Sequence, residues 1–572
     1  MDQELRERIE RSAEKHALFN ALKHDSEADL GAIMGPLMGE NPDFREFGDQ
    51  IPGIIGPIVA AVNDLDRAER RDRLAEIAPE GVEELEREPA EDDHDLPPLP
   101  GAEDVAEVRL RCAPNPNGPW HIGHARMGAV IGKYADRYDG WMLCRFDDTD
   151  PATKRPSLQA YDQILDDLAY LGFKPDEVLR ASDRLELYYE HARDVIELGG
   201  AYTCSCPAGE FSERKSAGEA CPHRDRPIDE SLAAFDRMVA GEFSAGDRVL
   251  RIRTDLEAPN PAERDWVAFR MVDEPHPRED AAADRCWPLL DFQSAIDDHH
   301  TQITHIIRGK DLQDSVARQG YLYEYLGWEY PTVLHWGRIS VDEYEFPLST
   351  STMGERIEAG DLTGWDDPAA PTLQSLKRRG IRGAAVTDAL AELGVSESDV
   401  ELSMSSIYAR NRERIDPIAD RYFLVRDGTR LPLVGDVPAT AEPPKHPTDE
   451  ERGNRTIPVG DAVRIEPGDL PAHGERVWLK GLGCVRAMRE ALELTGDSIE
   501  VVRDGDVPVI HWVPAGGAIP VTIRMPTGDS TGLAEPSFAE VDVDDVVQFE
   551  RVGFARVDSH ARDESIVYFA HN

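Results

Sequence analysis

The fold class of this 572-residue chain is indicated most clearly by one segment, Arg111-Cys-Ala-Pro-Asn-Pro-Asn-Gly-Pro-Trp-His-Ile-Gly-His-Ala-Arg126. The apolar run 105–112 predicts a β-strand, and the pattern of residues 125–134 predicts a helix. A strand, a turn with Gly and Pro, and a helix begin a βαβ unit of an α/β domain. Because the first turn of a helix presents unpaired N–H groups and a positive dipole, this turn is a natural phosphate site.

Two histidines, His121 and His124, stand at the expected start of that helix. Their spacing places both imidazoles on one helix face, where they can stabilise charge during displacement at a nucleotide α-phosphate. Gly123 between them has no Cβ, so a flat ring can pack against the backbone. Two purely structural histidines are the alternative, which the Pro/Asn/Gly loop 114–119 disfavours.

His121-Ile-Gly-His124 resembles the HIGH signature of class I aminoacyl-tRNA synthetases, and the residues before it resemble the glutamyl/glutaminyl branch. Several ordered motifs are specific where one alone is not. Further segments similar to the branch follow in order: Arg145-Phe-Asp-Asp-Thr-Asp-Pro151, Ile296-Asp-Asp-His299, Thr304-His-Ile-Ile-Arg-Gly-Lys-Asp311, Trp365-Asp-Asp-Pro368, Leu376-Lys-Arg-Arg-Gly380 and Gln548-Phe-Glu-Arg-Val-Gly-Phe554.

The resemblance and the pattern of apolar segments and turn residues along the chain together predict a multi-domain α/β protein with a Rossmann-type class I catalytic domain. Short strands with turn signals after about residue 420 predict antiparallel β-barrels rather than a helical C-terminus. The expected parts are a helical N-terminal extension similar to archaeal-type members (1–85), an acidic Pro-rich linker (86–103), the catalytic domain (104–360) with an inserted acceptor-binding subdomain (about 200–285), a helical stem-contact region (361–415) and anticodon-binding β-barrels (416–572).

The charge of the chain is strongly negative, with 111 Asp and Glu against 63 Lys and Arg and a net charge of −48. Only ten of those cations are Lys. An acidic, Lys-poor surface suits molar salt, where the Debye length falls to about 3 Å. We therefore interpret the charge as halophilic adaptation, which does not exclude a tRNA partner.

The sequence favours a soluble, cytoplasmic protein. The charged N-terminus has no signal-peptide pattern. The longest apolar stretch, 51–62, is interrupted by Pro and Gly and is shorter than the ~20 residues that span a bilayer. Seven cysteines in so long a chain do not indicate a disulfide framework.

The amino-acid pocket decides between glutamate and glutamine. Glutamate carries two carboxylates and one ammonium, so its pocket needs two cations and an anion, and Arg grips a carboxylate with two N–H groups. The resemblance implies that Arg111 and Arg308 take the carboxylates, Asp147 takes the ammonium and Asn115 lines the pocket. Glutaminyl enzymes tend to lack an Arg at the position of Arg308. A surface ion pair is the alternative role for Arg308.

A second ATP signature, the KMSKS-type loop, has a counterpart in Phe346-Pro-Leu-Ser-Thr-Ser-Thr352, which has no lysine. Thr350 stands where the family's lysine steadies the pyrophosphate, and Ser349, Thr350 and Ser351 can still bind phosphate. Mg²⁺ or another cation must then supply the charge, and Arg356 is our candidate. The expected ATP-binding residues are Pro114, Gly118, His121, Gly123, His124, Ser349, Thr350 and Ser351.

In one further place the chain departs from the branch. Pro288-Leu-Leu-Asp-Phe292 carries Leu290 where relatives often have a Tyr. Leu290 cannot donate a hydrogen bond to the substrate's side-chain carboxylate.

Cys204, Cys206, Cys221 and His223 form a C-x-C…C-x-H set in a polar insertion. Three thiolates and an imidazole complete a tetrahedral shell for structural Zn²⁺ and leave no open position for catalysis. A metal can supply folding energy that a polar segment lacks. A vestigial, metal-free knuckle is the alternative.

The resemblance implies ATP-dependent ligation of L-glutamate to tRNA(Glu), and in archaeal-type members also tRNA(Gln), with tRNA bound before glutamate is activated. Glutaminyl-tRNA synthetase, a small-molecule nucleotidyltransferase and a non-catalytic tRNA-binding protein are the alternatives. Arg308 disfavours the glutaminyl enzyme, and the long β-structured C-terminus disfavours the nucleotidyltransferase. The non-catalytic protein is disfavoured by the intact set Arg111, Asp147, His121 and His124. The N-terminal bundle fits a tRNA-binding or protein-docking module equally well.

Overall fold

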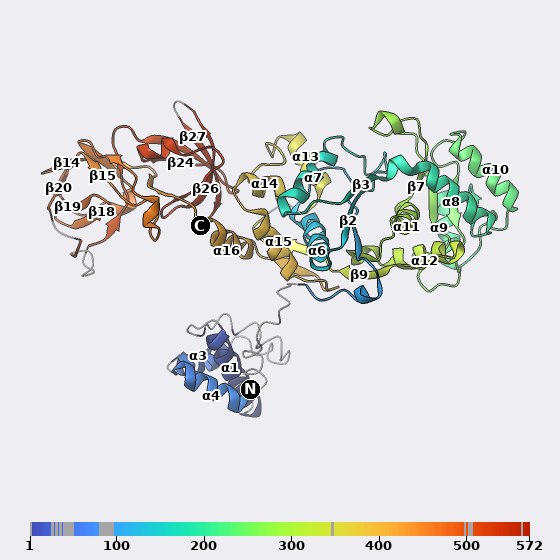
Figure 1. Cartoon of the computed structure of the whole chain (residues 1–572), viewed down its shortest axis with the longest axis horizontal. Coiled ribbons are helices and arrows are strands. Elements are labelled where there is room, and N and C mark those ends of the chain that lie inside the picture. Colours follow the sequence, from blue (N-terminus) through green and yellow to red (C-terminus); the bar gives the residue numbers. More distant parts are fainter. Residues whose placement is uncertain are drawn as a thin grey trace. The chain divides into compact units, whose positions relative to one another are not determined.

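The computed structural model divides into two units, Met1–His94 and Asp95–Asn572 (Figure 1). It describes residues 3–23, 28, 33, 37, 51–63, 65–78, 96–344, 348–496, 499–500, 507–561 and 564–572. Among the helices in these ranges, none combines the length and the apolar composition that a membrane span requires.

The first unit is helical over its described residues: α1 (Gln3–Lys23), α3 (Ile51–Asn63) and α4 (Arg67–Ile77). Small and branched side chains make its two cores: Ala17, Leu18, Val59 and Val62 in one, Ile9, Ala13, Ile51 and Ile55 in the other. Asp66 and Glu69 form a capping box at the start of α4, which satisfies N–H groups that the helix leaves open.

Part of the expected linker 86–103 is buried, although its composition predicts a solvent-exposed segment. Residues 86–95 lie outside the described residues, but Leu96 and Leu99 are buried in the catalytic core. The Tyr134 hydroxyl donates to the Pro97 carbonyl at 2.9 Å. Burial of two leucines outweighs the polar composition around them, so the catalytic unit begins before residue 104.

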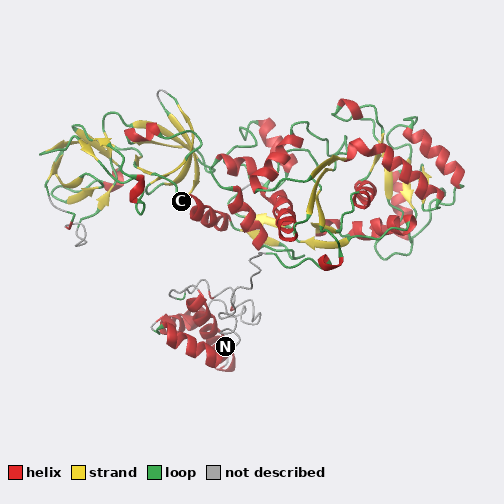
Figure 2. Ribbon diagram, viewed as in Figure 1, coloured by secondary structure: helices red, strands yellow, loops and turns green. Residues whose placement is uncertain are grey.

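Parallel strands form the centre of the catalytic domain (Figure 2). β1 (Arg109–Cys112), β2 (Trp141–Phe146) and β3 (Glu177–Arg180) make one sheet in the order β1-β2-β3. β8 (His305–Gly309) pairs with β9 (Thr332–Trp336), and Thr304 joins this pair to β1 through hydrogen bonds with the Arg109 backbone. The strands β2 and β8 thus flank β1, and ligands bind at such a switch point beyond the carboxyl ends of the strands.

Helices that connect these strands are α6 (Ile122–Tyr138), α7 (Ala160–Leu171), α8 (Leu185–Glu197), α11 (Leu290–His300) and α12 (Asp314–Leu326). Trp120, Tyr134 and Phe146 lie in the core between them. The result is the Rossmann-like arrangement of parallel strands and helices that the sequence predicts.

An antiparallel sheet interrupts the parallel one, in the range expected for the insertion. Its strands are β4 (Ala201–Cys204), β5 (Val249–Ile252), β6 (Val267–Met271) and β7 (Cys286–Pro288), in that order. The helices α9 (Ala208–Ala217) and α10 (Ile228–Val239) accompany it.

The segment after β9 contains short helices and one pair of strands: β10 (Ile339–Val341), α13 (Thr350–Ala359), α14 (Leu373–Arg378), α15 (Gly383–Glu392), β11 (Val400–Leu402) and α16 (Met404–Ile415). β10 and β11 are parallel partners. Residues 346 and 347 of the second nucleotide loop lie outside the described residues.

Two seven-stranded sheets make up the C-terminal part. The first has the order β12 (Arg421–Tyr422), β25 (Val546–Phe549), β26 (Gly553–His560), β27 (Ser565–His571), β23 (Ile519–Arg524), β24 (Ser530–Ala534), β13 (Leu424–Val425). The second has the order β21 (Val509–Ile510), β18 (Arg476–Leu479), β19 (Gly483–Ala487), β20 (Leu492–Leu494), β14 (Thr429–Val434), β17 (Ala462–Ile465), β22 (Val513–Pro514). A two-stranded ribbon, β15 (Thr440–Ala441) and β16 (Ile457–Pro458), is hydrogen-bonded to neither sheet but packs into the core of the second one.

Candidate active site and metal centre

The predicted histidine loop follows β1 and ends where α6 begins. His121 is the N-cap of α6, and its Nδ1 accepts from the His124 backbone N–H at 3.2 Å. The two imidazoles stack with ring centroids 3.8 Å apart. Burial, and then the charge of its neighbour His124, lowers the pKa of His121 to about 2. Removal from water, and then the charge of Lys154, lowers the pKa of His124 to about 4, although its side chain keeps an exposed edge.

The second nucleotide loop lies against the histidine loop. A Cβ on Gly118 would overlap Cγ2 of Thr350, and one on Gly123 would lie 3.2 Å from Cδ1 of Leu348. Ser349 caps α13 by accepting from the Thr352 N–H at 3.4 Å. The two predicted ATP segments therefore meet, and each ends at the N-terminus of a helix, where the helix dipole favours a phosphate.

Thr350 is buried at this contact, and its hydroxyl has no hydrogen-bond partner among the described residues. A buried hydroxyl without a partner is costly, so it is available to a ligand. Arg356, the cation proposed from the sequence, lies in the last turn of α13 and pairs with Asp361 at 2.9 Å. An ion pair with an acid makes Arg356 a weaker candidate for phosphate binding.

The predicted amino-acid pocket contains a buried network of opposite charges. Arg111 grips Asp298 through Nε and a terminal nitrogen, at 3.0 and 3.3 Å. Arg145 donates to Asp298 at 2.8 Å and to Asp147 at 2.7 Å. Burial raises the pKa of Asp298, but the two guanidinium groups outweigh it and hold that pKa below its usual value. Arg145 and Asp298 organise the network, although their motifs gave no hint of that pairing.

Arg308, at the end of β8, has a different environment. It donates to Gln319 Oε1 at 3.0 Å and to the Tyr330 hydroxyl at 3.3 Å. Its Nε is buried without a partner, and within the described residues no carboxylate forms an ion pair with it. Burial lowers the pKa of Arg308. A buried cation with neutral partners alone is unfavourable, so this guanidinium is suited to an anion from outside the chain.

The remaining predicted residues line the same region. Asn115 donates to the Asp147 carbonyl at 2.9 Å, and its Oδ1 is buried without a partner among the described residues. Pro114 accepts from the Asp147 backbone N–H at 2.9 Å. Leu290 begins α11 and is 40% exposed. Tyr330 and Gln319, which sequence reasoning missed, provide polar groups on this side of Arg308.

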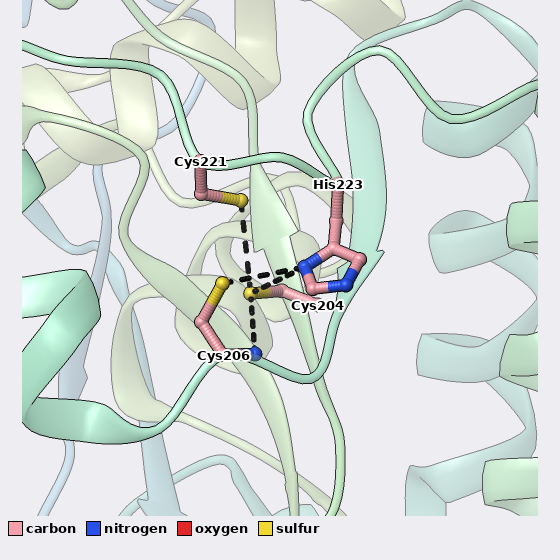
Figure 3. A group of neighbouring side chains, drawn as sticks. All are labelled: Cys204, Cys206, Cys221 and His223. Carbon is pink, nitrogen blue, oxygen red and sulfur yellow. Dashed lines mark hydrogen bonds between the residues drawn. The ribbon is translucent and has the colours of Figure 1, made fainter.

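Cys204, Cys206, Cys221 and His223 converge in the insertion (Figure 3). Their ligand atoms all lie within 4.8 Å of one another. Cys204 Sγ is 3.8 Å from Cys221 Sγ and 3.8 Å from His223 Nδ1, close to the ~3.8 Å edge of a tetrahedron with Zn–S bonds of ~2.3 Å. His223 Nε2 lies 3.2 Å from the Ser205 hydroxyl, an outer contact that can orient the ring. The donor set and its spacing are compatible with structural zinc.

Three family models match most of the second unit of the chain. A family model for the catalytic domain of class I tRNA synthetases (E and Q) matches residues 107–417. Two models for the anti-codon binding domain of the same class match residues 419–503 and 509–558. The chain is 62% identical to a glutamate–tRNA ligase of Natronomonas pharaonis and 60% identical to one of Haloarcula marismortui, with both chains covered completely. It is 43% identical to one of Methanothrix thermoacetophila, again over the full length of both.

Proposed function

Because this chain belongs to the glutamyl and glutaminyl branch of the class I aminoacyl-tRNA synthetases, we propose that its arginine cluster and paired nucleotide loops join L-glutamate to tRNA at the expense of ATP. Its activity is that of a glutamate–tRNA ligase. The observation that carries the choice of glutamate is Arg308, a buried cation that only neutral groups of the described chain contact. Glutamine would leave that charge uncompensated.

The activation step follows from the positions of the loops. An oxygen of the glutamate α-carboxylate attacks the α-phosphorus of ATP, the bond from that phosphorus to the bridging oxygen breaks, and pyrophosphate leaves with the electron pair. His121, His124 and the start of α6 stabilise the negative charge that develops on the α-phosphate. Mg²⁺ bound with ATP neutralises phosphate charge. The chain's part is chiefly positioning and electrostatics, since no protein nucleophile is needed.

The transfer step uses the glutamyl-adenylate. A hydroxyl oxygen of the terminal tRNA ribose attacks the glutamyl carbonyl carbon, and the ester to tRNA forms. The bond from that carbon to the phosphate oxygen breaks, AMP leaves with the electron pair, and the hydroxyl proton passes to the solvent. In this proposal Asp147 takes the substrate ammonium. Arg145 donates to Oδ1 of Asp147 at 2.7 Å and to Oδ2 at 3.5 Å, which orients the carboxylate. Ligation to tRNA(Gln) as well remains a prediction from the resemblance. The N-terminal helices fit a tRNA-binding or a protein-docking role equally well.

The cation that replaces the missing loop lysine is Lys154 in this proposal. Its loop is fixed: Asp150 accepts from the Thr153 N–H at 2.9 Å and from Arg270 at 2.6 Å, and the Ser157 N–H donates to Pro116 at 2.7 Å. These bonds hold the loop against the histidine segment. Within the described residues Lys154 has no ion pair, unlike Arg356, so its charge is available to phosphate.

The Cys/His set holds structural Zn²⁺ in this proposal. Cys204 and Cys221 are buried, at 1% and 4% exposure, and His223 contributes Nδ1. The metal, when bound, cross-links the start and end of the polar segment 204–223. Such a cross-link supplies folding energy that the few apolar residues there do not.

ATP–pyrophosphate exchange in molar KCl tests the function, with glutamate or glutamine and with or without total tRNA. Exchange with glutamate that needs tRNA is expected. Exchange with glutamine would contradict the role of Arg308. A folded protein without exchange under any of these conditions would contradict the ligase.

A further inference from the structure

The short helix α14 lies between the parallel strands of the second unit and its C-terminal sheets (Figure 1). Thr372, its N-cap, forms a β-bridge with His121. The backbone N–H of Ile122 donates to Pro371 at 3.0 Å, and that of Leu373 donates to Trp120 at 3.0 Å. The first turn of α14 is therefore bonded to the backbone that carries the catalytic histidine.

Arg379, at the other end of α14, is only 1% exposed. Its Nε donates to the Phe569 carbonyl at 2.9 Å, and a terminal nitrogen donates to the Ala570 carbonyl at 2.7 Å. Both carbonyls belong to β27, the last strand of the barrel sheet. Arg378 beside it reaches Asp558 of β26 at 3.3 Å.

The guanidinium of Arg379 also reaches the segment that leads into the second nucleotide loop. It donates to the Tyr344 hydroxyl at 3.3 Å and to the Tyr408 hydroxyl at 2.9 Å. Tyr408 donates in turn to Glu343 at 3.0 Å. Glu343 has a φ of +68°, an unfavourable backbone conformation for a residue with a side chain. Tertiary contacts must hold it, and the bond from Tyr408 is one of them.

One buried side chain, that of Arg379, thus bonds to the barrel, to α16 and to Tyr344, which precedes the loop that contains Thr350. A guanidinium with several directional donors fixes the relative positions of its partners better than apolar packing does. Displacement of β27 cannot leave Tyr344 or α14 unchanged without breaking at least one buried hydrogen bond, which is costly.

We propose that Arg379 is a positioning residue that couples the C-terminal barrel to both nucleotide loops, so that RNA bound to the barrel increases the rate of glutamate activation. The inference rests on the proposed function. It assigns the coupling to Arg379, Tyr344 and the helix α14.

The test compares two RNAs with the full-length protein. Exchange with glutamate is measured at saturating intact tRNA and at a saturating minihelix, an RNA with the acceptor stem and CCA end but no anticodon arm. In the wild-type protein we expect exchange to be at least about 5-fold faster with intact tRNA, the lower end of usual coupling. Tyr344→Phe and Arg379→Lys should reduce that ratio toward one, while minihelix-dependent exchange and the Kd of intact tRNA change little.

Matched controls separate coupling from stability. Tyr170→Phe removes one hydroxyl that donates to the Ile381 carbonyl at 2.7 Å, and Arg126→Lys alters an equally buried Arg that donates to Gly337 and Gly394. Neither of those bonds reaches the barrel. Both controls should lower the unfolding temperature as the test variants do and keep the ratio of the wild-type protein.

Two outcomes would overturn the inference. One is a wild-type ratio of one, and the other is an unchanged ratio in both Tyr344→Phe and Arg379→Lys. Either can occur in an active ligase, so they leave the proposed function intact. Absence of glutamate-dependent exchange with every RNA would instead remove the proposed function.

Discussion

His121 and His124 lie with their rings 3.8 Å apart and tilted by 20°, and the Nδ1 of the first accepts the backbone N–H of the second. This bond requires His121 Nδ1 to be unprotonated, so a proton on the ring sits on Nε2. The pair therefore meets a phosphate as neutral donors. Two adjacent cations in this position would repel each other.

The first prediction concerns pH. The pKa of His121 falls from 6.5 to about 2 on burial, so its contribution to stability is complete above pH 6.5 and is lost as pH falls below that value, because the unfolded chain then binds a proton that the folded chain does not. We expect the unfolding temperature of the wild-type protein to decrease from pH 7 to pH 5. His121→Asn should decrease less. An equal decrease in both proteins would contradict a neutral buried His121.

The second prediction concerns Lys154. Lys154→Met should lower kcat for glutamate-dependent exchange about 100-fold, the usual loss for one donor to transition-state charge, with little change in KM for glutamate. It should also raise the pKa of His124, because it removes a nearby positive charge. NMR titration measures the pKa and exchange kinetics measure kcat. Lys154→Arg should restore much of the rate.

The control for Lys154 is Lys174→Met, the same change at an exposed lysine just before β3. It should alter neither the rate nor the pKa of His124. Arg356→Ala should cost little, because Arg356 is engaged with Asp361. A large loss in Arg356→Ala beside full activity in Lys154→Met would return the role to Arg356.

The third prediction concerns the partners of Arg308. Tyr330→Phe removes the hydroxyl that contacts both Arg308 and Gln319. We expect KM for glutamate to rise roughly 10-fold, equivalent to about 1.4 kcal/mol, with kcat nearly constant. Tyr325→Phe, which removes a hydroxyl bonded to the Arg253 carbonyl, is the matched control. Equal effects of the two substitutions would argue against positioning of Arg308 by Tyr330.

The fourth prediction concerns the metal. The purified protein should contain about one zinc per chain, measured by atomic absorption. Cys204→Ser should lose the metal and unfold at a lower temperature, and a strong chelator should do the same to the wild-type protein. Cys484→Ser, at a buried thiol of the barrel, should keep its zinc. Wild-type protein free of metal and indifferent to chelation would contradict the knuckle.

Sequence reasoning predicted the parts of this molecule that short segments encode. The histidine loop, the Cys/His spacing and the β-rich C-terminus all depend on local patterns. The Leu96–Leu99 segment was misread, because local composition does not show that α6 offers it a surface. Gln319 and Tyr330 were missed for a related reason: they reach Arg308 from 11 and 22 residues further along the chain.

The structure shows where this acidic, Lys-poor chain keeps its buried positive charges. Relatives from halophilic archaea share the family, which agrees with adaptation to salt. The cations that the fold needs inside it are arginines, such as Arg111, Arg145 and Arg308. A guanidinium is more weakly hydrated than an ammonium and binds with a planar fork, so a chain can lose surface lysines and keep these networks.

The two nucleotide loops are in close contact at Gly118, where there is no space for a side chain. A single methyl group there would meet Thr350 and, at 3.3 Å, the ring of Trp365, and would act as a wedge that keeps the loops apart. Gly118→Ala should therefore yield a protein that still holds RNA on its distant barrels but is arrested before chemistry. Such a trapped form would be a practical starting point for isolating the RNA complex.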